Sequence, residues 1–139
     1  MSSKPESQFI ASVQRHLPPE HEFHREKMAN PYRGGTADSW YSGTRADLWV
    51  EWKFIILPKR PETVIDLAKE LSPLQQDWIA RRRVEGRNVW IGIGCKEGGV
   101  LLRDSTWPMA MPCKLFKLNL LTRPQIAASA VPAFMADTS

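Results

Sequence analysis

The sequence is poor in the residues that bind zinc or form disulfides. Its 139 residues include only two cysteines, Cys95 and Cys113, and three histidines. The cysteines fit no metal-ligand spacing and are too few for a disulfide framework, so we expect both to be reduced. His21 and His24 lack the helical spacing of a zinc protease, and His16 supplies no obvious third ligand, so we expect all three on the surface. The sequence therefore argues against both a zinc site and a disulfide framework.

Long apolar runs are also missing. No stretch approaches the roughly 18 consecutive apolar residues that a membrane-spanning helix requires. Residues 1–5 run into an amphipathic segment instead of the apolar core of a signal peptide, so we expect a cytoplasmic protein. No internal repeat is visible. We expect a single domain over residues 1–139, with its core at about 6–102 and a C-terminal extension over 103–139.

What is present is an ordinary soluble composition with a moderate excess of positive charge. Apolar residues make up 42% and charged residues 24% of the chain, which is typical of a globular protein. The net charge is +4 and the pI about 9.3, values compatible with a nucleic-acid partner. Of the six tryptophans, Trp40, Trp49 and Trp52 crowd one short segment, where we expect packing rather than base stacking.

Apolar spacing predicts a mixed α/β arrangement. Residues 6–17 have the apolar spacing of a helix, which Pro18-Pro19 ends. Strands are predicted at residues 22–28, 39–41, 48–57, 89–93 and 100–102, with the run 54–57 expected to be doubly buried and a turn expected at Gly98-Gly99. Residues 62–71 fit either a short helix or an ordered loop. Farther along, residues 114–121 are predicted as a strand and 124–130 as a short helix.

Ser72 opens the clearest helix signal in the chain. Serine caps the helix, Pro73 takes the first helical position, and Gln75 can close a capping box. Gly86 fits the helix end, so a helix is predicted over residues 72–84. A helix between two strands indicates a parallel crossover. The sequence therefore predicts a mixed central sheet flanked by helices.

The segment from Asp38 to Lys53 predicts a hairpin with two acids and a lysine on one face. A four-residue turn pairs Trp40 with Trp49 and Asp38 with Glu51, whose Cβ atoms would lie roughly 5 Å apart. Two carboxylates at that separation repel each other unless a cation lies between them. Lys53 lies two residues after Glu51 and so shares its face. This set of two acids and a lysine predicts a hard-metal site suited to attack on a phosphodiester.

Two other interpretations of these acids are weaker. Asp47 shares the face of Glu51 but lies at the turn, too far along the strand to share one ion easily. A surface charge cluster is disfavoured because Val50, Trp52 and Phe54 already supply the other, core-facing side of the strand. Burying two opposed acids without a purpose would be costly. We therefore prefer Asp38 as the partner of Glu51.

These features together resemble the PD-(D/E)XK nuclease superfamily. The matching pieces are Gly35-x-x-Asp38, the hairpin, Glu51-Trp52-Lys53, and Ser72-Pro73-Leu74-Gln75 before a helix and an apolar strand. The resemblance covers roughly residues 6–102 and is nearest to the VRR-NUC and Holliday-junction-resolvase-like nucleases, many of them encoded by phages. It implies a restriction-endonuclease-like α/β core. One departure is Ala37, which replaces the proline before the aspartate.

The resemblance also implies roles for individual residues. Asp38, Glu51 and the backbone carbonyl of Trp52 would bind Mg²⁺ or Mn²⁺, and Glu6 in the first helix would complete the site. An ordinary solvated position is an equally good interpretation of Glu6.

The remaining implied roles concern Lys53 and Gln75. Lys53 would position the attacking water and offset charge on the transition state. Gln75 would point at the site, unless it only closes the capping box. Together with Asp38 and Glu51, these two residues form the predicted catalytic set.

The sequence thus predicts a Mg²⁺-dependent DNA endonuclease that nicks DNA or cuts branched structures, in the host cytoplasm if a phage encodes it. A homodimer would let two sites cut both strands of a junction. We expect contacts with DNA from four basic residues, Arg33, Lys59, Arg60 and Arg82. The alternative function is a non-catalytic DNA-binding module that keeps the nuclease fold. Such a module would have no need of the intact acid-acid-lysine set.

Overall fold

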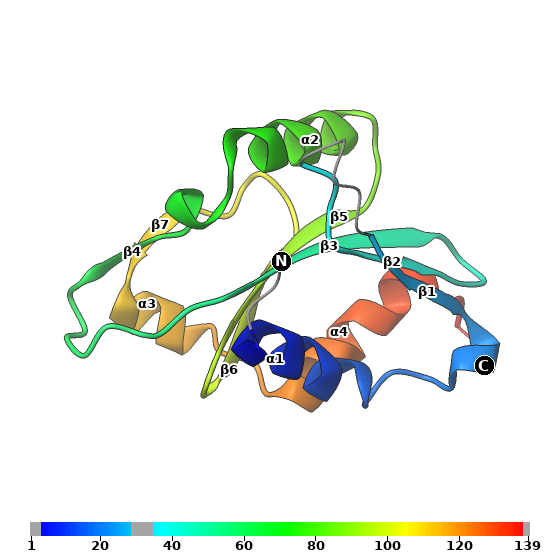
Figure 1. Cartoon of the computed structure of the whole chain (residues 1–139), viewed down its shortest axis with the longest axis horizontal. Helices are drawn as coiled ribbons and strands as arrows, with labels where there is room; N and C mark the ends of the chain where they lie inside the picture. Colours follow the sequence, from blue (N-terminus) through cyan, green and yellow to red (C-terminus); the bar gives the residue numbers. More distant parts are fainter. Residues whose placement is uncertain (1–3, 29–34, 138–139) are drawn as a thin grey trace.

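A five-stranded mixed sheet with helices on both faces forms the centre of the molecule (Figure 1), as a computed structural model describes it for residues 4–28 and 35–137. The spatial order is β1 (His24–Lys27), β2 (Ser39–Ser42), β3 (Asp47–Phe54), β5 (Val89–Cys95) and β6 (Gly98–Leu102). Only β3 and β5 run parallel among these neighbours. The predicted mixed α/β architecture is confirmed.

Helix α2 (Pro73–Val84) makes the crossover between the two parallel strands. Its start is the predicted capping box: the Gln75 backbone N–H donates to Ser72 Oγ at 3.1 Å, and the Ser72 N–H donates to Gln75 Oε1 at 2.9 Å. Gly86 follows the helix with φ +84°, a conformation that glycine adopts without strain. The helix and its parallel crossover are therefore both confirmed.

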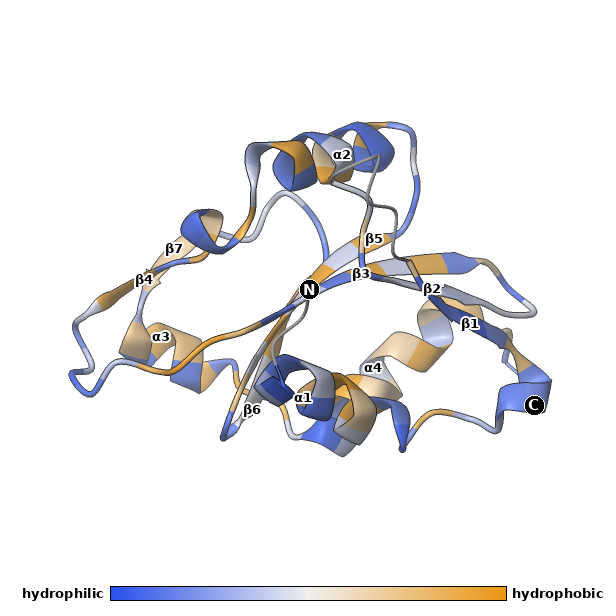
Figure 2. Ribbon diagram, in the orientation of Figure 1, coloured by the Kyte–Doolittle hydropathy of each residue, from blue (hydrophilic) through white to orange (hydrophobic). Residues whose placement is uncertain are grey.

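One face of the sheet is covered by α1 (Lys4–Gln14) and α4 (Arg123–Phe134), which lie together below the sheet in Figure 1. The core on this side contains Phe9, Trp52 and Phe134, all nearly or fully buried. Helix α4 is apolar along most of its length, whereas α2 is largely polar (Figure 2). The predicted helix at 124–130 is thus confirmed and extends farther than expected, because α4 has a long apolar face to bury.

The other face is covered by α2 and by a small lobe. The lobe consists of a two-stranded antiparallel sheet, β4 (Val64–Asp66) with β7 (Ala110–Pro112), and helix α3 (Cys113–Leu118). Two short 3₁₀ helices, η1 (Glu20–Glu22) and η2 (Leu67–Glu70), complete the described elements. The segment 62–71, left open between helix and loop, contains β4 and η2.

Two predicted strand segments are wrong. Residues 114–121 do not form a strand, because Cys113 and Phe116 are buried three residues apart on one side of α3, as helical spacing requires. The apolar run 54–57 does not extend β3, which ends at Phe54. Ile55 is buried there, but the side chain of Ile56 is 91% exposed. Strand β7 had no recognised sequence signal.

The expected state of the cysteines and histidines is confirmed. Cys95 and Cys113 are both free and buried, and the three histidines are exposed. No described helix combines the length and apolar character needed to cross a lipid bilayer.

Candidate metal and active site

The predicted hairpin register brings the two acids together. Trp40 pairs with Trp49, and Ser39 pairs with Val50. Asp38 immediately precedes Ser39, so the same register continues to Asp38 opposite Glu51. The Asp38 carboxylate accepts a hydrogen bond from the backbone N–H of Trp52 at 3.2 Å, which ties it to the strand that carries Glu51. The predicted hairpin register is therefore confirmed, and the pairing of the two carboxylates at a metal site stays a prediction.

Glu51 is a fully buried acid that receives no hydrogen bond from any donor group. Its exposed fraction is 0%, and both carboxylate oxygens lack a donor. Burying an ionised carboxylate without compensation is among the costliest arrangements in a protein. The Glu51 side chain therefore needs either a proton or a cation.

The local charges support the same conclusion. Burial raises the pKa of Glu51 to about 9, and the Asp38 carboxylate contributes in the same direction, while Lys53 opposes the shift. Burial also raises the pKa of Glu6, as does Asp38, whereas Lys53 and Lys27 lower it. Acids from α1, the start of β2 and β3 thus share one electrostatic environment with two lysines.

The donor set fits a hard cation held by few protein ligands. Across residues 4–28 and 35–137, no three or more histidine, cysteine, aspartate and glutamate side chains are arranged to hold a metal. Mg²⁺ commonly binds through only one or two carboxylates and keeps several waters. The facing carboxylates of Asp38 and Glu51, with the unpartnered oxygens of Glu51, fit that pattern. Ligation by Glu6 and by the Trp52 carbonyl stays a prediction.

Trp52 and Asp47 both lie as the sequence suggested. The Trp52 indole packs on the opposite face of the sheet, with its ring centroid 5.9 Å from that of Phe9. Asp47 is exposed, and its carboxylate accepts a hydrogen bond from Ser42 Oγ at 2.6 Å. The partner of Glu51 is therefore Asp38, and Asp47 is occupied at the far end of the hairpin.

Gln75 is engaged in the capping box through its side-chain oxygen, so its catalytic role stays a prediction. The helix start nevertheless contacts the segment that precedes Asp38. Gly35 has φ +99°, and a side chain there would collide with the backbone of Leu74. This glycine lets the segment that leads to Asp38 pack directly against the first turn of α2.

The predicted DNA contacts have different surroundings. Lys59 and Arg60 are exposed in the loop between β3 and β4. The Arg82 guanidinium lies 5.7 Å from the Trp78 ring centroid and forms an ion pair with Glu85 at 3.3 Å. Arg33 lies outside the described residues. Lys59 and Arg60 can therefore contact phosphates without breaking an internal contact.

Lys27 and an aromatic cluster at the site were not predicted. Lys27 pairs in register with Ser39 on the neighbouring strand. This position brings the Lys27 ammonium near enough to Glu6 to lower the pKa of that carboxyl. Beside Glu51 on β3, the Trp49 ring stacks on Trp40 at 5.7 Å and meets Trp78 edge-on at 5.5 Å. The tryptophan crowding was correctly interpreted as packing, but the contact with α2 could not be inferred from the hairpin alone.

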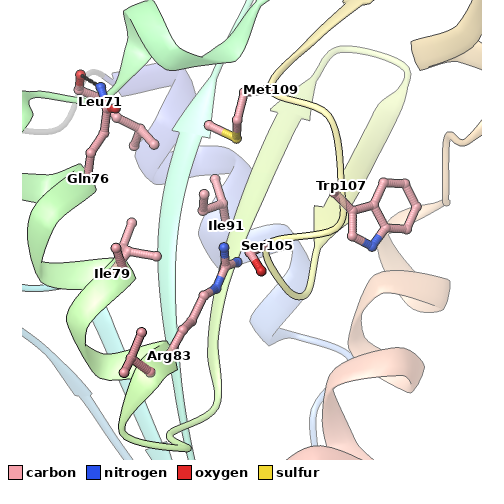
Figure 3. Close-up of a pocket in the computed structure, with 10 residues that line it drawn as sticks. Leu71, Gln76, Ile79, Arg83, Ile91, Ser105, Trp107 and Met109 are labelled. Carbon is pink, nitrogen blue, oxygen red and sulfur yellow. Dashed lines mark hydrogen bonds between the residues drawn. The ribbon is translucent and has the colours of Figure 1, made fainter.

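A cavity of about 500 Å³ lies on the side of the sheet that carries Glu51, between α2 and the loop after β6 (Figure 3). It is lined mainly by apolar side chains, including Ile79, Ile91 and Met109. Ile91 is the register neighbour of Glu51 on β5, yet none of the acids and lysines discussed above lines the cavity. Because it contains no carboxylate, this cavity is not the metal site.

Comparison with known proteins supports the fold. No protein-family profile and no curated protein sequence matches this chain. The structure is similar to that of Hjc, a Holliday junction resolvase from the hyperthermophile Archaeoglobus fulgidus, with a TM-score of 0.55 and 13% identity. The match covers 91% of this chain and 98% of Hjc. The chain therefore has the restriction-endonuclease-like fold.

Proposed function

We propose that this chain is a divalent-metal-dependent endonuclease of the PD-(D/E)XK type, acting on branched DNA. The observation that carries the proposal is the buried, unpartnered Glu51 carboxylate facing Asp38 beside Lys53. A carboxylate pair of this kind requires a cation or a proton. The fold similarity to a Holliday junction resolvase supports a junction as the substrate.

In this proposal Asp38 and Glu51 hold Mg²⁺ or Mn²⁺, with the Trp52 carbonyl as a further ligand and Glu6 adding negative charge. The cation, when bound, acts as a Lewis acid that polarises the scissile phosphate. The Lys53 ammonium orients the attacking water and stabilises the additional negative charge of the transition state. The Trp52 N–H holds the Asp38 carboxylate in place by its hydrogen bond.

Contacts with the DNA backbone would come from Lys59 and Arg60, with Arg33 and Arg82 as further candidates. A homodimer would present two sites to the two strands of a junction. An isolated monomer would nick one strand. The salt dependence of binding should decrease when Lys59 or Arg60 is replaced, since each phosphate contact releases counterions.

Cleavage by matched variants tests the proposal. Four-way junction, flap, single-stranded and plasmid DNA should be incubated with the wild type and with Glu51→Gln, Lys53→Ala and Asp47→Asn, with Mg²⁺ or with EDTA. The first two variants should lose cleavage, because each removes a group at the reacting phosphate. Asp47→Asn removes an acid from the same face of β3 at an exposed position and should cut normally. Wild-type cleavage rates in Glu51→Gln or Lys53→Ala would disprove the assignment.

The second candidate function is a DNA-binding module without catalysis. The exposed bases Lys59 and Arg60 and the net charge of +4 would serve such a module equally well. The two functions differ in metal binding. Titration with Mn²⁺ should give one saturable site that Glu51→Gln removes if the chain is a nuclease, and no specific site if it is only a binding module.

A further inference from the structure

Strand β5 has no side chains at two alternate positions on the α1 side of the sheet. Gly92 and Gly94 both lie there, and other groups fill the vacated space. A Cβ atom on Gly92 would lie 2.5 Å from the Trp52 indole, and one on Gly94 would lie 2.5 Å from the Phe9 ring. The two glycines therefore make room for Trp52 and Phe9.

The Phe9 ring sits in a socket formed by Gly94, Gly99, Trp52 and Arg123. Gly94 and Gly99 pair in register on β5 and β6, so together they give a flat floor without side chains. The Trp52 ring meets Phe9 edge-on, and the Arg123 guanidinium lies 5.2 Å from the Phe9 ring centroid. Phe9 is consequently only 2% exposed.

Arg123 connects three elements around this socket. Its Nε donates to Ser12 Oγ on α1 at 2.7 Å. Its terminal nitrogens donate to the carbonyls of Cys95 and Lys96 at the end of β5, at 3.5 and 3.4 Å. Arg123 itself is the first residue of α4. The arrangement fixes α1 against the sheet at the level of the Phe9 ring.

Glu6 lies three residues before Phe9 on the same helix, so the two side chains share one side of α1. The half-buried Glu6 carboxylate interacts electrostatically with Asp38 and Lys53. Because the Phe9 ring holds this turn of α1 in place, it also limits the positions that the Glu6 carboxylate can take.

We propose that Phe9, with its glycine floor and Arg123, is a positioning residue that holds the Glu6 carboxylate beside the Asp38–Glu51 pair and thereby sets the affinity for the divalent cation. This inference rests on the proposed function. Groups that only orient the residues around a metal typically change metal affinity by about 10- to 100-fold when they are replaced. Phe9 would do so without approaching the cation.

A double-mutant cycle on the full chain tests the inference. Mn²⁺ affinity should be measured by calorimetry for the wild type, Glu6→Gln, Phe9→Leu and the double variant. Each single variant should bind Mn²⁺ about tenfold more weakly, and the double variant no more weakly than Glu6→Gln alone, because Phe9 acts through Glu6. Arg123→Gln, which keeps the Phe9 ring, should show the same lack of additivity with Glu6→Gln.

Val13 provides the matched control, since it is also buried on α1 at 2% exposure but lies one turn beyond Phe9. Val13→Ala should leave Mn²⁺ affinity unchanged. Additive effects of Phe9→Leu and Glu6→Gln, or unchanged affinity in Phe9→Leu, would overturn the inference while leaving the nuclease assignment intact. If the wild type binds no Mn²⁺, the proposed function fails, and the inference fails with it.

Discussion

Replacing the buried acid Glu51 by glutamine should stabilise the metal-free protein at alkaline pH. The folded state keeps Glu51 protonated up to a pKa of about 9, against the ordinary value of 4.5. Because the pKa of Glu51 is higher in the folded state, protonation of this side chain stabilises the fold. That stabilisation is fully present below the ordinary pKa of the carboxyl, and it is lost as the pH rises toward the pKa of the folded state. Glutamine has the same shape and does not titrate, so it avoids this loss.

The magnitude follows from proton linkage. Between the two pKa values the folded state binds one proton more than the unfolded state, so stability decreases by about 1.4 kcal/mol per pH unit. From about pH 5 to about pH 8, the wild type should therefore lose up to about 4 kcal/mol relative to Glu51→Gln. That is a large share of the roughly 5–15 kcal/mol that stabilises a typical domain.

Urea denaturation in EDTA at both pH values measures this difference. Subtracting the stability of one protein from that of the other removes the contributions of all groups that the two proteins share. Asp47→Asn is the control, because it replaces an exposed acid on the same strand in the same way. Parallel stability curves for Glu51→Gln and the wild type would show that Glu51 is ionised in the folded state, and would refute the reasoning from burial.

Three further predictions concern metal uptake and the fold. At neutral pH, binding of Mg²⁺ or Mn²⁺ should release close to one proton, because Glu51 must ionise to become a ligand; calorimetry in buffers of different ionisation enthalpy measures this, and an absence of proton release would contradict it. Ser72→Ala removes one half of the capping box of α2 and should lower the free energy of unfolding by about 1 kcal/mol, which urea denaturation can detect; an unchanged value would mean that the cap contributes nothing. Phe116→Ala should cost about 3–5 kcal/mol, since its side chain is fully buried, whereas Leu118→Ala, at an 82% exposed position, should change stability little; equal effects would argue against helix α3.

The elements that were predicted correctly depend on local signals. The register of the hairpin follows from the length of its turn, and that register alone sets Asp38 opposite Glu51. The capping box that starts α2 involves residues only three positions apart. Sequence therefore predicted the register that brings the two strands of the acids together, although it could not indicate that Glu51 is fully buried, which depends on how α2 packs.

The errors fall where the outcome depends on distant partners. Alternation over 114–121 resembles a strand, but the segment packs Cys113 and Phe116 into the small lobe as a helix. That lobe exists only because β4 pairs with β7, some 45 residues later. Lys27 was missed for the same reason, since its place near the acids results from the pairing of β1 with β2.

The Phe9 socket has a consequence for the order in which the site can form during synthesis. Asp38, Glu51 and Glu6 are all made early, whereas the glycine floor and Arg123 come from later segments. Helix α1 therefore cannot dock until β5, β6 and the start of α4 have left the ribosome. A nascent chain that ends before Arg123 would carry the three acids without the contacts that place helix α1, so the proposed site would not be assembled at that stage.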